Sequence, residues 1–185
     1  MPATATPPPD ALVAGPAAGA VPIAQPNAEY LSFGLGAEEY GVDILRVQEI
    51  CRYGAVTRIP DAPDFVKGVV NLRGVIVPVF DLRLKLRLAA APYDDFTVMI
   101  VLKLAGRVTG IVVDRVSDVV ALQPAQIFPA PPIGPDGDMA FVTGLAALGD
   151  RMLILVDIER LLGDDGFAPL PGDPHASHVS QESLS

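Results

Sequence analysis

The residues that could perform chemistry are few in this sequence and are widely spaced. Cys51 is the single cysteine, so the chain can form neither an internal disulfide nor a thiolate metal site. The two histidines, His175 and His178, both lie in a polar segment near the C-terminus. A Ser-His triad, a Cys-His pair or a histidine metal site is therefore not expected in the body of the protein.

The acidic pairs and one glycine motif are also weak signals for catalysis. Asp94-Asp95 and Asp164-Asp165 are adjacent residues, which point to opposite faces of a strand, so solvated loop charges are favoured over an acid–base pair. Gly34-Leu35-Gly36 begins a dinucleotide-binding pattern, but Glu39 occupies the third glycine position. An inert buried thiol is favoured for Cys51. A small hydrolase using Cys51 or a carboxylate pair is the enzymatic alternative, and no cofactor is expected.

Charge and hydropathy argue against two classes of partner. The 185-residue chain has 13 Lys and Arg against 22 Asp and Glu, a formal net charge of −9, which would repel the phosphates of nucleic acid. The longest apolar runs, such as residues 75–80, are far shorter than the about 20 residues that a membrane-spanning helix needs. We therefore expect neither nucleic-acid binding nor direct membrane insertion.

The two ends of the chain differ from its middle. Residues 1–28 are mostly Ala and Pro and lack the large apolar side chains that would offset the entropy of ordering. They also lack the basic and apolar regions of a signal peptide. Residues 166–185 have a similar composition. We expect a disordered leader over 1–28, a folded body over 29–165 and a flexible tail over 166–185.

The body contains an internal repeat. Residues 65–86 align without a gap with residues 141–162, and Phe, Val, Gly, Leu and Asp recur at matching positions. A fainter similarity relates residues 31–50 to residues 100–119. Each half thus contains a strand, a turn, a strand, a later hairpin and a short amphipathic helix. Self-similarity at this period indicates two copies of one supersecondary unit.

The local patterns in both halves predict short strands joined by tight turns. Asp81 and Asp157 are expected to cap helices over 82–88 and 158–162. Residues 75–80 and 152–156 are nearly continuous apolar runs, which predicts strands covered on both faces. Because barrel closure removes exposed edges, each half is expected to form a small barrel, and the two barrels to pack around shared apolar surface with a groove between them. The other strands are expected at 29–35, 40–44, 96–104 and 108–113.

Two local features are candidates for partner recognition. In the segment Val47-Gln48-Glu49-Ile50 the strand period places Val47 and Glu49 on one face, although a half-buried strand is the simpler interpretation. The hairpin at residues 71–74 has Asn71 and Arg73 where its repeat has Ala and Gly. The fold evidently tolerates small residues there, so this polar pair can serve binding, and arginine is a common interface anchor. A solvated turn arginine is the alternative.

The body as a whole closely resembles the CheW family of chemotaxis coupling proteins. The resemblance covers residues 29–163 and implies an all-β fold, in which two five-stranded SH3-like barrels with short helices intertwine as one domain around a shared hydrophobic core. It also implies a non-enzymatic adaptor. The segments that carry it are EEYGVDILRVQEI (38–50), VTRIP (56–60), FVKGVVNLRGVIVPVFDLR (65–83), GIVVDRVSDV (110–119) and TGLAALGDRMLILVDIERLL (143–162).

The resemblance further implies two partners and a surface for each. The partners are the cytoplasmic tip of methyl-accepting chemoreceptors and the regulatory domain of the histidine kinase CheA. This implies a cytoplasmic protein recruited to membrane-associated receptor arrays, and a related pilus or surface-sensing array is the alternative setting. The receptor surface implied by the family motifs is Val47, Glu49, Asn71, Arg73 and Val119. The kinase contacts are expected near Tyr40 and Tyr53 in the first barrel and from Ile127 to Ile133 in the second, where the loop over residues 129–139 departs from the usual family pattern.

Overall fold

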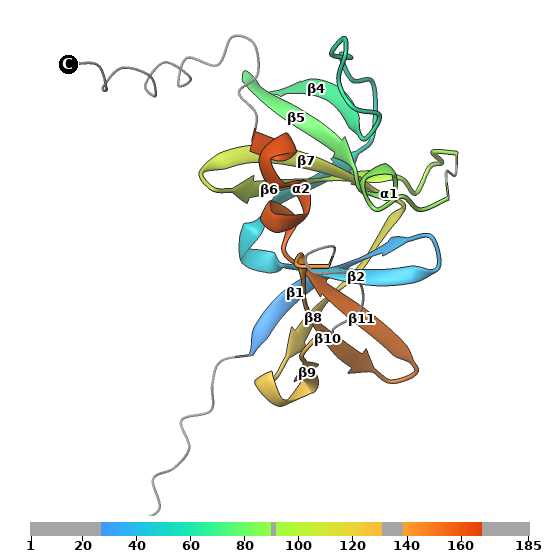
Figure 1. Ribbon diagram of the computed structural model, residues 1–185, viewed down its shortest axis with the longest axis vertical. Helices are drawn as coiled ribbons and strands as arrows, with labels where there is room; N and C mark the ends of the chain where they lie inside the picture. Colours follow the sequence, from blue (N-terminus) through green and yellow to red (C-terminus); the bar gives the residue numbers. More distant parts are fainter. Residues whose placement is uncertain (1–26, 90–91, 131–138, 168–185) are drawn as a thin grey trace, which may run out of the picture.

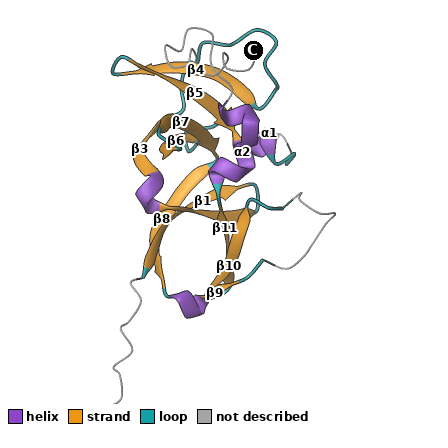
Figure 2. Ribbon diagram, turned by 60° about the vertical axis from the view of Figure 1, so that its left-hand side comes forward, coloured by secondary structure: helices purple, strands orange, loops and turns teal. Residues whose placement is uncertain are grey.

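The computed structural model describes residues 27–89, 92–130 and 139–167, which form two β-sheets that pack on each other (Figures 1 and 2). In order across the sheet, the five-stranded one consists of β3 (Val47–Arg52), β6 (Val98–Leu104), β7 (Arg107–Val113), β5 (Val75–Asp81) and β4 (Val66–Leu72). The six-stranded one consists of β8 (Arg115–Leu122), β1 (Ala28–Leu35), β2 (Glu38–Asp43), β11 (Arg151–Val156), β10 (Val142–Leu148) and β9 (Ile127–Phe128). These sheets are called below the five-stranded barrel and the six-stranded barrel.

Helices are short in the described part of the chain. Helix α1 spans Leu82–Lys85 and α2 spans Ile158–Phe167, with non-helical backbone at Gly163. Two 3₁₀ helices, Ile44–Arg46 and Pro124–Gln126, precede β3 and β9. No helix among the described residues is long and apolar enough to cross a membrane.

Each barrel takes strands from both halves of the sequence. The repeat pairs β1, β2 and β3 with β6, β7 and β8, and it pairs β4 and β5 with β10 and β11. Replacing each strand by its repeat partner converts the order β3-β6-β7-β5-β4 into β8-β1-β2-β11-β10, which is the six-stranded order without the two-residue β9. Residues related in this way are called twins below. The expectation that each half closes its own barrel is therefore wrong, because the β1–β2 and β6–β7 hairpins are exchanged.

The exchanged hairpins are held by parallel pairing. Strand β2 pairs with β11 and β7 pairs with β5, both in parallel, whereas the neighbours within each hairpin are antiparallel. Neither half could bury its hairpin without the other half. The two halves should therefore fold as one cooperative unit.

A close backbone approach closes the five-stranded barrel. Thr57 and Val69 exchange two backbone hydrogen bonds of 2.9 and 2.8 Å, which bring the segment after β3 onto β4. Gly68 makes this contact possible, since a Cβ atom there would lie 2.1 Å from the Thr57 carbonyl oxygen. Its twin, Gly144, admits β9 in the same way, because a Cβ there would lie 2.8 Å from Ile127 Cγ2.

The two barrels share one hydrophobic core. Fully buried side chains from both sheets and both helices form a single cluster, so burial of apolar surface holds the barrels to each other as well as closing each one. The largest of them are Phe33, Leu35, Leu82, Ile100, Leu102, Leu104, Ile111, Ile158 and Leu162.

Both helix caps expected from the sequence are confirmed. The Asp81 carboxylate accepts hydrogen bonds from the backbone N–H groups of Arg83 and Leu84, and Asp157 accepts one from Arg160. Other details differ from expectation. Helix α1 ends at Lys85. Neither β5 nor β11 is covered on both faces at its start, since Val75 and Ile76 are 50% and 54% exposed and Met152 is 51% exposed.

Candidate partner-binding surfaces

An ion pair joins the two ends of the five-stranded sheet at its surface. Arg73 donates from Nη2 to Glu49 Oε2 at 2.7 Å and from Nη1 to Glu49 Oε1 at 3.3 Å, in bidentate geometry. Glu49 comes from β3, and Arg73 comes from the turn between β4 and β5. The Arg73 side chain is 82% exposed, so its guanidinium can contact a partner while Glu49 orients it.

The backbone of Arg73 adopts a conformation that normally favours glycine. Its φ is +53° and that of Gly74 is +88°, as in the two-residue turns that suit the twist of a hairpin. The side chain of Asn71 fixes the turn, because its Oδ1 accepts from Gly74 N at 2.7 Å. The twin of Arg73 is Gly149, whose φ is +61°. Glycine is therefore sufficient for folding at this position. Arginine in the left-handed region lowers the stability of the folded chain by about 1 kcal/mol relative to glycine.

The two valines proposed for the receptor surface lie on different barrels. Val47, at the start of β3, is half-buried and packs against the shared core. Val119 is 46% exposed on β8 of the six-stranded barrel, where it pairs with Leu31. Figure 2 shows β3 and β8 one above the other on the left side, with the 3₁₀ helix at 44–46 between them. The structure thus brings Glu49, Asn71 and Arg73 together, with Val47 on the same strand as Glu49 and Val119 on the neighbouring barrel.

A buried serine supports the strand that carries Val119. Ser32 is 2% exposed, its Oγ donates to the carbonyl oxygen of Asp118 at 3.0 Å, and it accepts from Asp118 N at 3.1 Å. These bonds lie where the pairing of β1 with β8 shifts register. Ser32 therefore has a structural role and is not available as a nucleophile.

The residues proposed for kinase contact differ strongly in exposure. Tyr40 is only 8% exposed and its ring stacks on Phe33 at 5.9 Å between centroids. It lies on β2 in the six-stranded barrel together with Ile127, so its expected place beside Tyr53 in the first barrel is wrong. The error follows from the exchange of the β1–β2 hairpin. Tyr53 and Ile127 are half-buried, and Ile133 lies outside the described residues.

The candidate catalytic groups are poorly placed for catalysis. Cys51 is half-buried on β3 beside the Met99 carbonyl oxygen, 3.7 Å away. Burial and then the charge of Glu49 raise the pKa of its thiol, so the reactive thiolate is disfavoured. Asp94 accepts hydrogen bonds from the backbone of Phe96 and Thr97 and holds a turn. Within the described ranges no three His, Cys, Asp or Glu residues are grouped as metal ligands.

Comparison with known proteins identifies the family. A family model of the CheW-like domain matches residues 29–166. The chain belongs to the CheW family. It is 58% identical over 140 residues to a chemotaxis protein CheW of Klebsiella aerogenes, covering 76% of this chain and 84% of that protein. It is 37% identical over 133 residues to the corresponding protein of Rhizobium meliloti, covering 72% and 86%.

A solved structure confirms the fold class. The scaffolding protein TtCheW from Thermoanaerobacter tengcongensis superposes with a TM-score of 0.70 at 33% identity, covering 76% of this chain and 95% of that one. The predicted all-β fold of two SH3-like barrels is confirmed, with β9 as an additional short strand in one sheet. This CheW-like chain is a chemotaxis adaptor, and the comparisons favour that function over a non-flagellar array.

Sequence reasoning missed a pair of charged clusters between the barrels of this CheW-like domain. In the first, Glu159 of α2 accepts from Arg46 Nη1 at 2.6 Å and from Ala105 N at 2.8 Å. In the twin cluster an arginine stands in place of the glutamate, and the twin of Arg46, Arg115, does not take part in the ion pair. There Arg83 occupies the position of the glutamate and pairs with Asp114 at 2.9 Å, and Asp114 accepts from Gly36 N at 2.7 Å.

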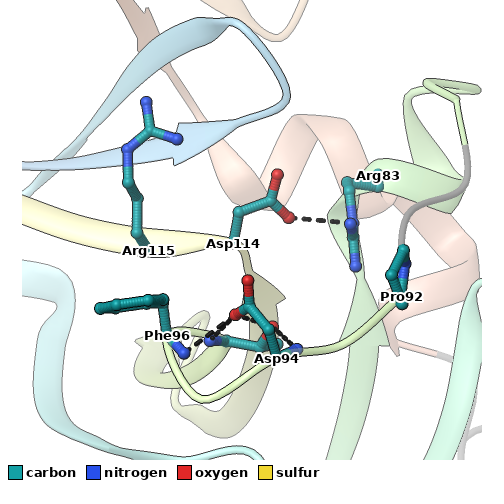
Figure 3. A pocket seen from close by; sticks show the side chains of 7 residues that line it. Arg83, Pro92, Asp94, Phe96, Asp114 and Arg115 are labelled. Carbon is teal, nitrogen blue, oxygen red and sulfur yellow. Dashed lines mark hydrogen bonds and ion pairs between the residues drawn. The ribbon is translucent and has the colours of Figure 1, made fainter.

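The twin cluster borders a pocket of about 270 Å³ (Figure 3). Arg83 and Asp114 face each other there, and Arg115 points away from them toward the β1–β2 hairpin (Figure 3). Arg83 also lies 5.3 Å from the ring centroid of Tyr93, whose hydroxyl donates to Asp81 Oδ2. Burial, followed by this hydrogen bond, raises the pKa of Tyr93 well above its ordinary value. The only sequence signal was the equivalence of Arg46 and Arg115 in the repeat.

Proposed function

We propose that this chain acts without catalysis as a cytoplasmic scaffold at membrane-associated receptor arrays. It would hold the cytoplasmic tip of a methyl-accepting chemoreceptor and the regulatory domain of the kinase CheA in one complex. The observation that carries this proposal is the placement of Arg73. An exposed arginine stands in a left-handed turn where its twin is glycine, and it is oriented by a bidentate pair with Glu49.

The receptor surface would consist of Val47, Glu49, Asn71 and Arg73, with Val119 at its far wall. A receptor helix would lay apolar side chains against the valines, in the helix-in-groove mode. Arg73 would supply the polar contact that fixes the position of the helix. Because Arg73 is already paired, a partner carboxylate would share its guanidinium with Glu49 or replace Glu49 as its ligand.

The kinase would contact the ends of both barrels, through surfaces like its own. Tyr53 would contribute from the five-stranded barrel, and Ile127 from the six-stranded barrel, with Ile133 further along the same segment. The exposed side chain of Phe128, 53% accessible beside Ile127, supports an interface there. Tyr40 would contribute no more than its exposed edge.

The variant Arg73→Gly tests the receptor surface, because it copies the twin turn and should fold normally. Binding of the full chain to a receptor-tip helical hairpin and to the kinase regulatory domain would be measured separately by calorimetry. Receptor binding should weaken by about 1–3 kcal/mol, the range for an interface anchor, while kinase binding stays unchanged. An unchanged dissociation constant for the receptor hairpin would remove Arg73 from the site.

A further inference from the structure

A second groove lies away from the proposed receptor surface. It has a volume of about 800 Å³ and forms where α1, the segment after it and the start of α2 meet. Figure 2 shows α1 and α2 next to each other on the side opposite β3 and β8. Phe65 and Phe141 are twins and both line the groove, so both halves of the sequence contribute to it. The other apolar lining residues are Tyr40, Leu84, Leu86, Leu88, Met139, Ala140 and Leu161.

The charged residues of this groove are all cations. They are Lys85, Arg87 and Arg160, and no Asp or Glu is found among the described residues that line it. This composition is opposite to the net charge of the chain, which is −9. Lys85 lies 4.3 Å from the ring centroid of Phe65, and Arg160 pairs with Asp157 at 3.5 Å. The exposed side chain of Arg87 has no hydrogen-bond or ion-pair partner within the described ranges.

The backbone around Arg87 is ordered by a helix-terminating motif. Leu88 N donates to the Arg83 carbonyl at 2.8 Å, and Arg87 N donates to the Leu84 carbonyl at 3.1 Å. This is the pattern of a Schellman motif, in which the residue at the position of Arg87 is left-handed and is usually glycine. Arg87 has a φ of +55°. As at Arg73, an arginine occupies a place where glycine would fold more readily, which is typical of a residue retained for function.

We propose that this groove binds an amphipathic helix of a partner protein whose apolar face is flanked by Asp or Glu, with Arg87 as its main charged contact. The apolar lining would receive the helix face, and the cations at the rim would pair with the flanking carboxylates. Charge complementarity is the reason for an acidic partner. The inference does not rest on the receptor surface described above, because the two surfaces share no residue.

The probe is a fluorescein-labelled helical peptide of about 14 residues, or four turns, with Leu along one face and Glu on its flanks. Its binding to the full chain would be followed by fluorescence anisotropy at low salt. The variant Arg87→Gly should weaken binding by at least about ten-fold, the effect of losing one hot-spot side chain. It should unfold at the same temperature or higher, because glycine relieves the left-handed backbone. Arg87→Lys, which keeps the charge, should bind within about three-fold of wild type.

Arg73→Gly is a matched control, since it makes the same substitution in the same backbone conformation on the other surface. It should leave peptide binding unchanged, just as Arg87→Gly should leave receptor binding unchanged. Equal binding by the Arg87→Gly protein, or no loss when Gln replaces Glu in the peptide, would overturn the proposal. So would absence of peptide binding together with binding to vesicles of phosphatidylglycerol. Binding that appears only after removal of residues 168–185 would also overturn it, by making that segment the occupant.

Discussion

Replacing Gly68 by Ala should open the five-stranded barrel at its closing contact. An added Cβ would lie 2.1 Å from the Thr57 carbonyl oxygen, 2.7 Å from its carbonyl carbon and 3.1 Å from Arg58 Cα. All three are backbone atoms, so no side-chain rotation can relieve the clash. The φ of Gly68 is +135°, which alone costs about 1–3 kcal/mol for a residue with a Cβ. Moving the backbone apart would also weaken the two hydrogen bonds between Thr57 and Val69, at about 0.5–1.5 kcal/mol each.

The sum is about 2–6 kcal/mol, a large part of the about 5–15 kcal/mol that stabilises a typical domain. The assay is urea unfolding of the full chain, with Gly149→Ala as the control. Gly149 is also left-handed, at +61°, but a Cβ there would meet nothing within 4 Å, so that variant should lose only about 1 kcal/mol. If Gly68→Ala is no less stable than Gly149→Ala, the close contact with Thr57 is not the reason that position 68 requires glycine.

Three further outcomes follow from the described contacts. Glu159→Gln should lower the free energy of unfolding by about 1 kcal/mol at low salt and by less at high salt, because it weakens the partly exposed pair with Arg46; equal loss at both salt concentrations would contradict this. Tyr93→Phe should reduce the fall in stability above about pH 10. Since burial and then the hydrogen bond to Asp81 raise the pKa of Tyr93 in the folded state, its contribution is present below pH 10 and is lost as the unfolded chain ionises; parallel pH profiles would show that the pKa of Tyr93 is not raised in the folded protein. Cys51 should react with iodoacetamide at pH 7.5 more slowly than a free cysteine, because burial and then the charge of Glu49 raise the pKa of its thiol; a rate equal to that of free cysteine would contradict this.

The repeat and the turn glycines were sufficient to predict most strands and both helix caps. They did not predict the exchange of hairpins, because sequence similarity shows which segments are alike and not which copy each one pairs with. The parallel pairing of β2 with β11 decides this, and it depends on contacts between residues more than 100 positions apart, such as Tyr40 and Ile154. For the same reason Tyr40 was assigned to the wrong barrel.

In the candidate sites, too, features set by neighbouring residues could be predicted from the sequence, whereas contacts between residues far apart in the chain could not. The turn at Arg73 is visible as a local pattern, and the structure adds its pairing with Glu49, which requires closure of the barrel. Arg87 was expected inside a helix over residues 82–88. The sequence does not show that α1 ends at Lys85, because the left-handed position after the helix is occupied by Arg87 and not by the glycine that usually indicates a helix end. The proposed role of Arg87 therefore depends on the structure.

The proposed scaffold binds receptor and kinase at the same time through different surfaces. Its most direct test is sedimentation of the full chain with a receptor-tip hairpin and the kinase regulatory domain, at micromolar concentrations. We expect one complex that contains all three components, and no association of kinase domain with receptor hairpin when the chain is omitted. Displacement of one partner by the other, or failure of either to bind, would contradict the claim.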